Sequence, residues 1–579
     1  MSTDTNMQVT NNTAVSRSGK RENRLYLLDG IIIVAMGILM FCGASWQIFK
    51  PGTDVAKYQC YASVFLHGTQ AAKSYTQHQC DFIFDPQTYT NAKIATTLHK
   101  YGAPDFLVNF VKQQNVSQSF RALPHEYPLL TLLPFLLVLA SPQSWYQVAF
   151  AILMALLAGG MYVLLARFKS RTVAIIGAAL LVIGGWSTAA GRFDLVPSLL
   201  TLVAVILAER KRWTGAFVLL ALAFLMKFYP VMLLIPFLVG QQMEQHTKWN
   251  AWSRWKPFAA FIGVCVLVMG VSFLLSVEGT VSPLSYFETR PIQAESLGSS
   301  LLWLATLVTH HPLSFEFTYH SLNVQPVHIL TALVTYGESL LELAGLAFVA
   351  WLLWQRRINL ALATLLTLLV VIVTGKVFSP QYLIWIIPLV AYAGGTKWRW
   401  VVSWVAICAL TTLIYPYTYY APGHTGIVQV PLVPWFYPAV TARNFILFGV
   451  VLVSFIYYAR KQMLLTPATE RVNSEGTALI SDEEETGSDA RTQVKDQPAI
   501  LEANTDVEYA LPDVHAEFDE DISNAVPDMN VAEKNTPEVA IDTKDLSTVE
   551  ENGASEDKPV SAKDVDAKSK PASNASSVS

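Results

Sequence analysis

The sequence predicts an all-α protein that crosses a membrane many times, and three observations support this fold class. Of the 579 residues, 52% are hydrophobic and only 15% are charged, whereas soluble globular proteins carry about 25% charged residues. The mean hydropathy is +0.36. Long apolar stretches recur along the chain, and clusters of Lys and Arg flank them. These features exclude a soluble enzyme, a nucleic-acid-binding protein and a disordered scaffold as descriptions of the whole chain.

The formal net charge of −4 hides two oppositely charged parts. Residues 466–579 hold 27 acidic and 9 basic residues, a net charge of −18, which leaves +14 on the rest of the chain. That stretch cannot bury enough apolar surface to offset the entropy lost on ordering. We therefore expect an acidic, disordered cytoplasmic tail over residues 461–579 and a disordered cytoplasmic N-terminus over 1–24. Residues 25–460 form the membrane domain.

The first apolar stretch, about 25–49, follows Lys20, Arg21 and Arg24. No small-residue cleavage site comes after it, so we expect an uncleaved first span. Its basic flank places the N-terminus in the cytoplasm. Residues 50–126 then form a long first outer loop, whose apolar patches suit amphipathic helices lying on the surface.

Eleven further apolar stretches follow, and basic clusters indicate their cytoplasmic ends. The stretches are 127–140, 144–166, 172–190, 195–208, 214–239, 257–277, 327–354, 358–375, 382–396, 400–420 and 443–458. The clusters are Arg167/Lys169/Arg171, Arg210/Lys211/Arg212, Lys248/Arg254/Lys256, Arg356/Arg357, Lys397/Arg399 and Arg460/Lys461. Together with the first span, this pattern predicts about 10–13 membrane segments, with both termini in the cytoplasm.

Two of these stretches are expected to be broken or re-entrant. Residues 127–140 are only 14 in number, fewer than the roughly 20 needed for a straight crossing. Residues 214–239 have basic clusters at both ends and the sequence KFYP, from Lys227 to Pro230, in the middle. We expect two half-helices meeting there. Non-helical backbone at membrane depth is tolerated where it lines a cavity, so both breaks predict one.

This topology brings five polar segments to the outer face, namely 50–126, 191–194, 278–326, 375–381 and 421–442. Asp54 directly follows the first span, in the sequence KPGTDVAKYQC. A carboxylate in a partly desolvated cleft at the membrane surface can act as a general base. The structural alternative is that Thr53 or Asp54 caps a helix over 55–67.

Other charged residues of the outer face allow a functional and a structural interpretation. Glu126 and Tyr127, in LPHEYPLL, are either substrate-binding residues or an interfacial charge and a member of an aromatic belt. Arg192 and Asp194, in GRFDLVPSLL, either neutralise each other or mark a functional site, because charges at membrane depth are costly.

Two lysines raise a further question. Lys227 has no acidic residue nearby in its apolar stretch, so it needs a carboxylate or a ligand phosphate from elsewhere in the structure. Lys376, in TGKVFSPQYLIW, needs an anion in the same way unless it snorkels to the membrane interface.

The 278–326 loop carries a dense polar run, YFETRPIQAES, with Arg290, Gln293 and Glu295. The apolar stretch 297–309 that follows is too short to span. Four histidines come next: His310, His311, His320 and His328. They could contact a phosphate or move a proton, or they could be solvated loop residues. The sequence contains no zinc-type spacing, P-loop, dinucleotide-binding fingerprint or nucleophile elbow. We expect no cofactor and no metal ligand set, although the abundant acidic residues leave a divalent metal open.

The five cysteines are too few for a disulfide scaffold and lack metal-binding spacing. Only Cys60 and Cys80 fall in the same hydrophilic stretch. They can pair if that stretch is extracytoplasmic, or they remain two free thiols.

Taken together, these motifs resemble glycosyltransferase family 87. Five motifs occur in the order expected for the family: Asp-x-x-x-Tyr after the first span, EYPLL, the GRFDLVPSLL-to-KFYP block, RPIQAES and FSPQYLIWIIP. The resemblance covers about residues 25–460. It implies a GT-C fold, and the family contains bacterial polyprenyl-phosphate-mannose-dependent mannosyltransferases. An insertion of roughly fifty residues before Glu126, containing Cys80, departs from the family pattern and affects the acceptor groove.

The resemblance implies an inverting membrane glycosyltransferase. The expected reaction moves a hexose, with mannose favoured, or a pentose from a polyprenyl-phosphate donor to a lipid-linked or cell-envelope acceptor on the extracytoplasmic face. Asp54 matches the acid that deprotonates the acceptor hydroxyl. The cations expected to stabilise the leaving phosphate are, in order, Arg290, Arg192, Lys227 and Lys376. The residues expected to bind the rest of the substrates are Glu126, Tyr127, Asp194, Tyr229, Gln293, Glu295 and His320. The partners are these substrates and the cell-membrane bilayer, with no nucleic acid.

Two other function classes compete with this interpretation. A transporter or lipid flippase also has broken helices and charges at membrane depth, but no internal repeat links residues 25–240 with 257–460. A membrane scaffold acting through its acidic tail is the third class. Deletion of residues 466–579 distinguishes it, because only a function of the tail would be lost.

Overall fold

A computed structural model describes the chain over residues 11–75, 78–85, 89–245, 248, 250–288, 290–326, 328–421 and 426–461. The predicted acidic tail, apart from Lys461, lies outside the described residues. Helix α1 begins at Asn11, so it extends into the segment for which we expected disorder. Adding a residue to an existing helix costs far less than nucleating one, and the apolar span provides the existing helix.

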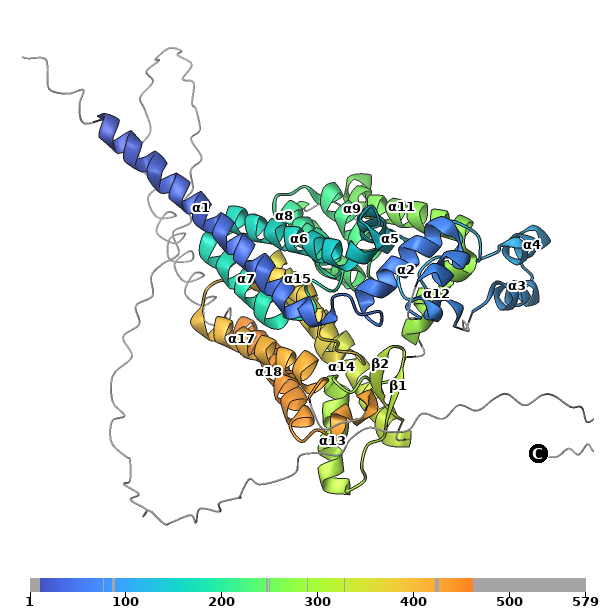
Figure 1. The fold of residues 1–579 in the computed structure, drawn as a ribbon. Coiled ribbons are helices and arrows are strands. Elements are labelled where there is room, and N and C mark those ends of the chain that lie inside the picture. The colour runs from blue at the N-terminus through green and yellow to red at the C-terminus, as the bar shows by residue number, and fades with distance from the viewer. Residues whose placement is uncertain are drawn as a thin grey trace, which may run out of the picture. The chain divides into compact units, whose positions relative to one another are not determined.

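Within the described residues, the chain forms helices almost throughout, with one small sheet (Figure 1). The first half contains α1 (Asn11–Ala44), α2 (Asp54–His67), α3 (Asn91–Lys100), α4 (Asp105–Gln113), α5 (Leu132–Val138), α6 (Tyr146–Phe168), α7 (Arg171–Gly184), α8 (Leu195–Glu209), α9 (Trp213–Phe224) and α10 (Leu234–Gln245). The second half contains α11 (Trp252–Leu275), α12 (Val277–Glu288), α13 (Leu297–Thr309), β1 (Phe315–Thr318), β2 (Ser321–Val324), α14 (His328–Trp354), α15 (Leu360–Thr374), α16 (Tyr382–Gly394), α17 (Trp398–Thr412) and α18 (Phe436–Lys461). Short helical turns connect them: η1 (Ser45–Gln47), η2 (Thr69–Ser74), η3 (Asp81–Phe84), η4 (Leu129–Thr131), η5 (Gln143–Trp145), η6 (Tyr229–Leu233), η7 (Leu413–Thr418) and η8 (Ile427–Leu432).

Among the described residues, six helical segments are long and apolar enough to cross a membrane. They are Tyr26–Gln47, Gln143–Phe168, Trp252–Leu275, Ile329–Trp354, Trp398–Thr418 and Phe436–Arg460. Seven shorter apolar helices accompany them. The protein is therefore a multi-pass membrane protein, and its described residues are all-α apart from one hairpin.

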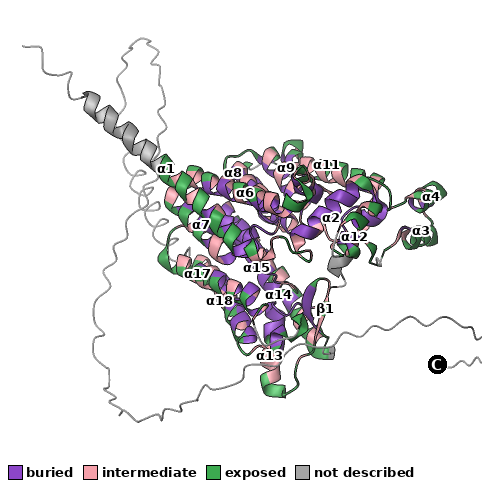
Figure 2. Ribbon diagram, in the orientation of Figure 1, coloured by how far each residue is buried: buried purple, intermediate pink, exposed green. Residues whose placement is uncertain are grey.

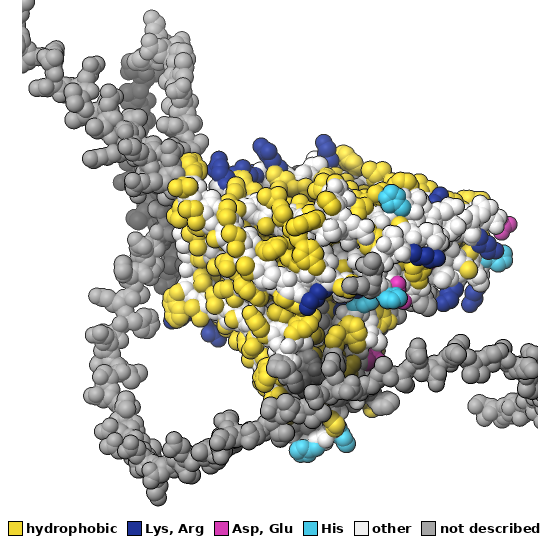
Figure 3. All heavy atoms as spheres, in the orientation of Figure 1, with side chains coloured by type: hydrophobic (Ala, Val, Ile, Leu, Met, Phe, Trp, Pro, Cys, Tyr) yellow, Lys and Arg dark blue, Asp and Glu magenta, His cyan; other side chains and the backbone are white. Residues whose placement is uncertain are grey.

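The long helices differ in how much of their apolar surface the protein itself covers. Only 11% of the apolar window of α11 and 17% of that of α14 is buried, whereas α15 is buried along most of its length. Large side chains such as Leu267 and Leu340 are two-thirds exposed. Apolar surface of this extent is stable against lipid and unfavourable in water. Figures 2 and 3 show exposed positions and hydrophobic side chains spread over the same visible face, around α1, α6 and α7.

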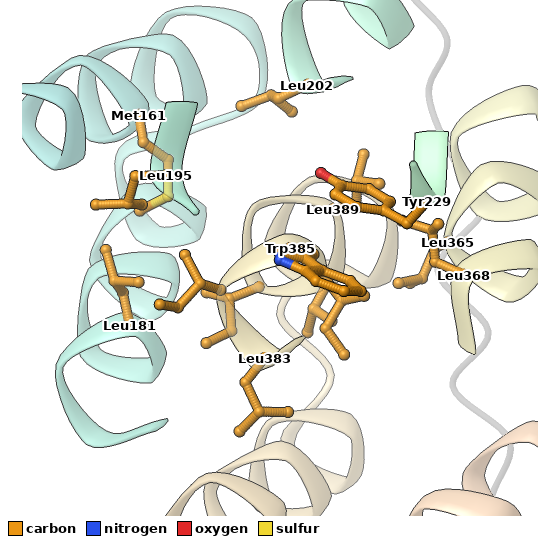
Figure 4. Close-up of a cluster of buried hydrophobic side chains, with 14 of the residues drawn as sticks. Met161, Leu181, Leu195, Leu202, Tyr229, Leu365, Leu368, Leu383, Trp385 and Leu389 are labelled. Carbon is orange, nitrogen blue, oxygen red and sulfur yellow. The ribbon is translucent and has the colours of Figure 1, made fainter. Parts of the chain in front are cut away.

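The core is centred on α15 and α16, which pack against each other and against α7 and α8. Trp385 on α16 stacks on Tyr229 of η6 with ring centroids 4.4 Å apart and an interplanar angle of 8°. Figure 4 shows this pair surrounded by leucines from α8, α15 and α16. The stack fixes the broken segment that carries Lys227 against two buried helices.

Both predicted breaks are present. After Tyr127 and Pro128 the chain forms only the turn η4 and the seven-residue helix α5. The second break separates α9, which ends at Phe224, from α10, which begins at Leu234. Pro230 lies in the turn η6 between them, where its missing N–H and fixed φ angle prevent a continuous helix.

The start of the first outer loop differs from the prediction of surface-lying helices. Helix α2 is buried from Val55 to Phe65, apart from Lys57, and packs on α5 and α6. Tyr58 stacks on Phe135 with ring centroids 4.3 Å apart, which ties the loop to the membrane domain. Helices α3 and α4 are more exposed and pack on each other. A disulfide joins Cys60 to Cys80 and decides between the two states that the sequence left open.

The hairpin of β1 and β2 was not predicted. Phe315 pairs with Val324 and Thr318 with Ser321 in antiparallel register. Its turn residues Tyr319 and His320 both have positive φ angles, 53° and 50°. Such turns usually carry Asn-Gly or Asp-Gly, so the sequence offered no signal. Residue 293 forms a bridge to Asn323 of β2, which positions the polar run YFETRPIQAES.

Candidate functional site

A cavity of about 430 Å³ lies where the five segments predicted for the outer face meet. Its charged and amide-bearing lining residues are Asp54, Lys57, Glu126, Arg192, Lys227, Arg290, Gln293, Glu295, His320 and Gln381. Its tyrosines are Tyr127, Tyr319, Tyr382, Tyr415, Tyr419 and Tyr420. Nine of the twelve candidate residues named from the sequence line this cavity; Asp194, Tyr229 and Lys376 do not.

Asp54 begins α2 and reaches the cavity because another residue caps the helix. The side chain of Thr53 accepts a hydrogen bond from the backbone N–H of Ala56 at 3.3 Å. The Asp54 carboxylate is therefore not used by its own helix. It forms an ion pair with Arg192, whose Nη2 lies 2.6 Å from Oδ2. About a quarter of the Asp54 side chain is exposed, so the carboxylate is accessible from the cavity.

Asp194 and Lys227 form the second ion pair of the site. Asp194 is fully buried, and its Oδ1 accepts hydrogen bonds from Lys227 Nζ and from the indole N–H of Trp385. The protein carboxylate that Lys227 required is therefore Asp194. The interpretation in which Arg192 and Asp194 neutralise each other is wrong. Arg192 pairs with Asp54, and Asp194 pairs with Lys227.

Tyr229 and Lys376 support the wall of the cavity without lining it. The Tyr229 ring lies behind the wall on Trp385, and its hydroxyl is 3.4 Å from that of Thr201. Lys376 is exposed at the end of α15, and its backbone carbonyl accepts the N–H of Gln293 at 2.9 Å. The structure thus uses the main chain of Lys376 to hold Gln293.

Glu126 connects the outer loop to the hairpin. Its Oε1 is 3.8 Å from Lys57 Nζ and 3.3 Å from His320 Nε2. The neighbouring Tyr127 packs edge-on against Phe193, with ring centroids 5.1 Å apart.

A buried network that sequence analysis missed holds Glu295. Tyr419 donates a hydrogen bond to Oε1 of Glu295 at 2.7 Å, and Arg443 Nη1 lies 3.6 Å from Oε2. Arg443 also donates to the backbone carbonyl of Glu295, and its guanidinium lies 4.0 Å from the ring of Phe378. Burial raises the pKa of Glu295, while Arg443 and Tyr419 act in the opposite direction. The signal in the sequence was Arg443 itself, a charged residue at the start of the apolar stretch 443–458.

The arrangement combines the accessible Asp54 carboxylate with several cations and many neutral hydroxyl donors. Lys227, Arg192 and Arg290 come from three different segments and line the same cavity. Cations placed this way can neutralise a phosphate, and tyrosines and amides can bind sugar hydroxyls. Over the described part of the chain, no three His, Cys, Asp or Glu side chains gather in a metal-binding arrangement.

Comparison with known proteins yields a family model and a solved structure to which the chain is similar. A model of the family described as GPI transamidase subunit PIG-U matches residues 181–290. This stretch includes Arg192, Asp194, Lys227 and Arg290. The chain is also similar to the crystal structure of ArnT from Cupriavidus metallidurans in the apo state, with 14% identity, a TM-score of 0.31, and coverage of 69% of this chain and 74% of that chain. No curated protein sequence matches the chain.

Proposed function

We propose that this membrane protein is a GT-C-type inverting glycosyltransferase of the family 87 kind. In this proposal it transfers a hexose, with mannose favoured, or a pentose from a polyprenyl-phosphate donor to a lipid-linked or envelope acceptor on the extracytoplasmic face. The observation that carries the proposal is the Asp54–Arg192 ion pair at the wall of a cavity that also contains Lys227 and Arg290. The sequence motifs set out above supply the sugar chemistry.

The proposed reaction has one transition state with two developing charges. The acceptor oxygen attacks the anomeric carbon of the donor sugar while its proton passes to the Asp54 carboxylate. The bond between the anomeric carbon and the phosphate oxygen breaks, and the polyprenyl phosphate leaves with the electron pair. The sugar is transferred with inversion, and all atoms are accounted for without a further reactant.

The ion pair couples these two events. Before reaction, the negative charge of Asp54 compensates Arg192, which lies 2.6 Å away. When Asp54 takes the proton it becomes neutral, and the positive charge of Arg192 is uncompensated at the moment the phosphate gains negative charge. Two unit charges 4 Å apart attract each other by about 4 kcal/mol at an effective dielectric constant of 20. Stabilisation of that size in the transition state alone corresponds to roughly a 10³-fold faster reaction.

The test is an assay of the purified full-length protein with several polyprenyl-phosphate sugars, followed by mass spectrometry of the lipid products. We expect a product from at least one donor, and Asp54→Asn should lower the rate about 10²–10⁴-fold without changing thermal stability. Asp105→Asn is the matched control, because Asp105 also begins a helix in the outer loop but lies outside the cavity. Full activity of Asp54→Asn would overturn the assignment of the base.

The partial match to a transamidase subunit favours a second candidate, a membrane-complex subunit that binds a lipid-linked glycan without transferring a sugar. Such a protein would form no product when purified, and Asp54→Asn would still bind its partners. The flippase alternative predicts movement of the labelled lipid between leaflets of proteoliposomes in place of a new glycolipid.

A further inference from the structure

A second, smaller cavity lies between α2, the outer-loop residues that follow it, and the start of α12. Its volume is about 240 Å³, somewhat below the 300–1,000 Å³ typical of sites for drug-sized ligands. It therefore holds one small group. Part of its lining comes from residues 69–125, which belong largely to the insertion that departs from the family pattern.

The two cavities lie along one face of the same helix. Asp54 and Lys57 line the first cavity, and Tyr61 and Val64 line the second. Positions separated by three and four residues share one side of an α-helix. Ten residues of helix span about 15 Å, which is the approximate distance along α2 between the backbones of Asp54 and Val64.

Two consecutive residues form another connection between the cavities. Glu126 lines the first and His125 lines the second. A ligand whose reacting hydroxyl lies at Asp54 could thus extend along α2 and past residues 125–126 into the second cavity.

The second cavity contains a polar atom that the protein itself leaves without a partner. His125 Nδ1 is buried and neither accepts nor donates a hydrogen bond. Burial lowers the pKa of His125, with Glu126 acting against this effect, so its ring is neutral above the lowered pKa. Glu278 lies opposite in the lining; its Oε2 accepts the backbone N–H of Asn91 at 2.9 Å. An unpaired buried group is costly, and a ligand hydroxyl would remove that cost.

The remaining lining residues exclude two ligand classes. Arg121 uses its Nη1 to hold the backbone carbonyls of Leu274 and Leu275, at 2.8 and 2.9 Å, and the carboxyl groups of Asp85 and Glu278 disfavour an anion. A metal ion is also disfavoured, because the described residues contain no cluster of three suitable ligands. What fits is a neutral ring with several hydroxyls, facing carboxyl and imidazole groups and the aromatic side chains of Tyr61 and Phe84.

We propose that the second cavity binds one neutral sugar unit of the acceptor, at a distance along α2 from the unit that reacts. The acceptor role rests on the proposed transferase function, whereas binding of a neutral sugar does not. In this proposal the inserted residues form a subsite that selects acceptors long enough to reach it.

The first part of the test measures binding without reaction. Methyl α-D-mannopyranoside is titrated into the purified full-length protein in detergent and followed by saturation-transfer NMR, with inorganic phosphate as the charged comparison. We expect the sugar to bind saturably and phosphate not to displace it. Ser117→Trp, at an exposed position of the rim, should weaken binding at least tenfold, and so should His125→Phe. His125→Gln, which keeps a hydrogen-bonding group, should bind within about threefold of the wild type.

Asp54→Asn separates this proposal from the proposed function. It should abolish transfer and leave sugar binding unchanged, because Asp54 lies in the other cavity. Unchanged binding in Ser117→Trp, or displacement of the sugar by phosphate, would overturn the subsite. If the wild type binds the sugar in this cavity but forms no product with any donor, the transferase function fails while the sugar site stands.

Discussion

At the scale of single residues, the charges of the site are paired across the fold in a way that the sequence order conceals. Arg192 and Asp194 are two positions apart, yet Arg192 pairs with Asp54 and Asp194 with Lys227. The two pairs differ in environment. Asp194 is fully buried, whereas about a quarter of the Asp54 side chain is exposed. This difference predicts a structural role for the buried pair and a chemical role for the accessible one.

Removing one partner of the buried pair should be strongly destabilising. We expect Lys227→Met to lower the free energy of unfolding by about 3–5 kcal/mol, because it leaves the Asp194 carboxylate buried without its cation. The double variant Asp194→Asn/Lys227→Met should recover much of this loss. The measurement is thermal unfolding in detergent.

A surface ion pair provides the control for that comparison. Lys211 lies 3.1 Å from Glu244, and its side chain is 77% exposed. Lys211→Met should cost less than about 1 kcal/mol. Equal stability of Lys227→Met and Lys211→Met would contradict the structural role of the Asp194 pair.

Glu278 should give the protein a measurable pH dependence. Burial raises its pKa above the usual value of 4.5, and the hydrogen bond from Asn91 lowers it by less. The folded state therefore binds this proton more tightly than the unfolded state, so the contribution of Glu278 is fully present below the unfolded pKa and is lost as pH rises through the folded pKa. Thermal unfolding between pH 4 and pH 8 should show Glu278→Gln gaining stability relative to the wild type as pH increases. A difference independent of pH would refute this.

At the scale of secondary-structure elements, short irregular segments position the site. Lys227 lies in the break between α9 and the turn η6, where Pro230 interrupts the membrane helix. The hairpin of β1 and β2 holds residues 292–294 through backbone hydrogen bonds, such as Ala294 N–H to Leu322 at 2.9 Å. Pro230 makes the helix break predictable from the sequence, whereas the turn residues Tyr319 and His320 do not predict the hairpin.

The disulfide should stabilise the outer loop by restricting its unfolded state. Cys60 and Cys80 are 20 residues apart, and closing a loop of this length is worth about 3 kcal/mol in the chain-entropy model. Cys80→Ser, or reduction of the wild type, should lower the unfolding temperature and expose the segment between the two cysteines to protease. Cys265→Ser, which removes a free thiol, is the control. If reductant lowers the unfolding temperature of the wild type no more than that of a Cys60→Ser/Cys80→Ser variant, the reductant acts elsewhere in the protein. If neither substitution of the cysteines nor reduction changes stability, the prediction is wrong.

At the scale of the whole molecule, all the outer-face segments predicted from basic clusters contribute to one cavity. Asp54, Arg192, Glu295, Ser379 and Ile427 represent the five segments in its lining. Residues from all five segments thus meet at this cavity. The exposed apolar surfaces of α11 and α14 leave the membrane as their environment.

The acidic C-terminal stretch should be dispensable for activity. Residues 466–579 carry a net charge of −18 and lie beyond α18, which ends at Lys461. Their deletion should leave the rate of sugar transfer and the unfolding temperature within experimental error of the full chain. A loss of activity at unchanged stability would assign the tail a role in the reaction or in partner binding.

Hydropathy and residue patterns in the sequence predicted the membrane character, the approximate spans, the two broken segments and most of the polar residues of the site. These follow from hydropathy, proline and charge, whose effects act locally along the chain. The three-dimensional structure was needed to show which charges pair, that Cys60 and Cys80 form a disulfide, that α2 is buried, and that Arg443 holds Glu295. Each of these depends on contacts between parts of the chain that the sequence does not place next to each other. Arg443 and Glu295 are 148 positions apart, and no local pattern specifies such a pair.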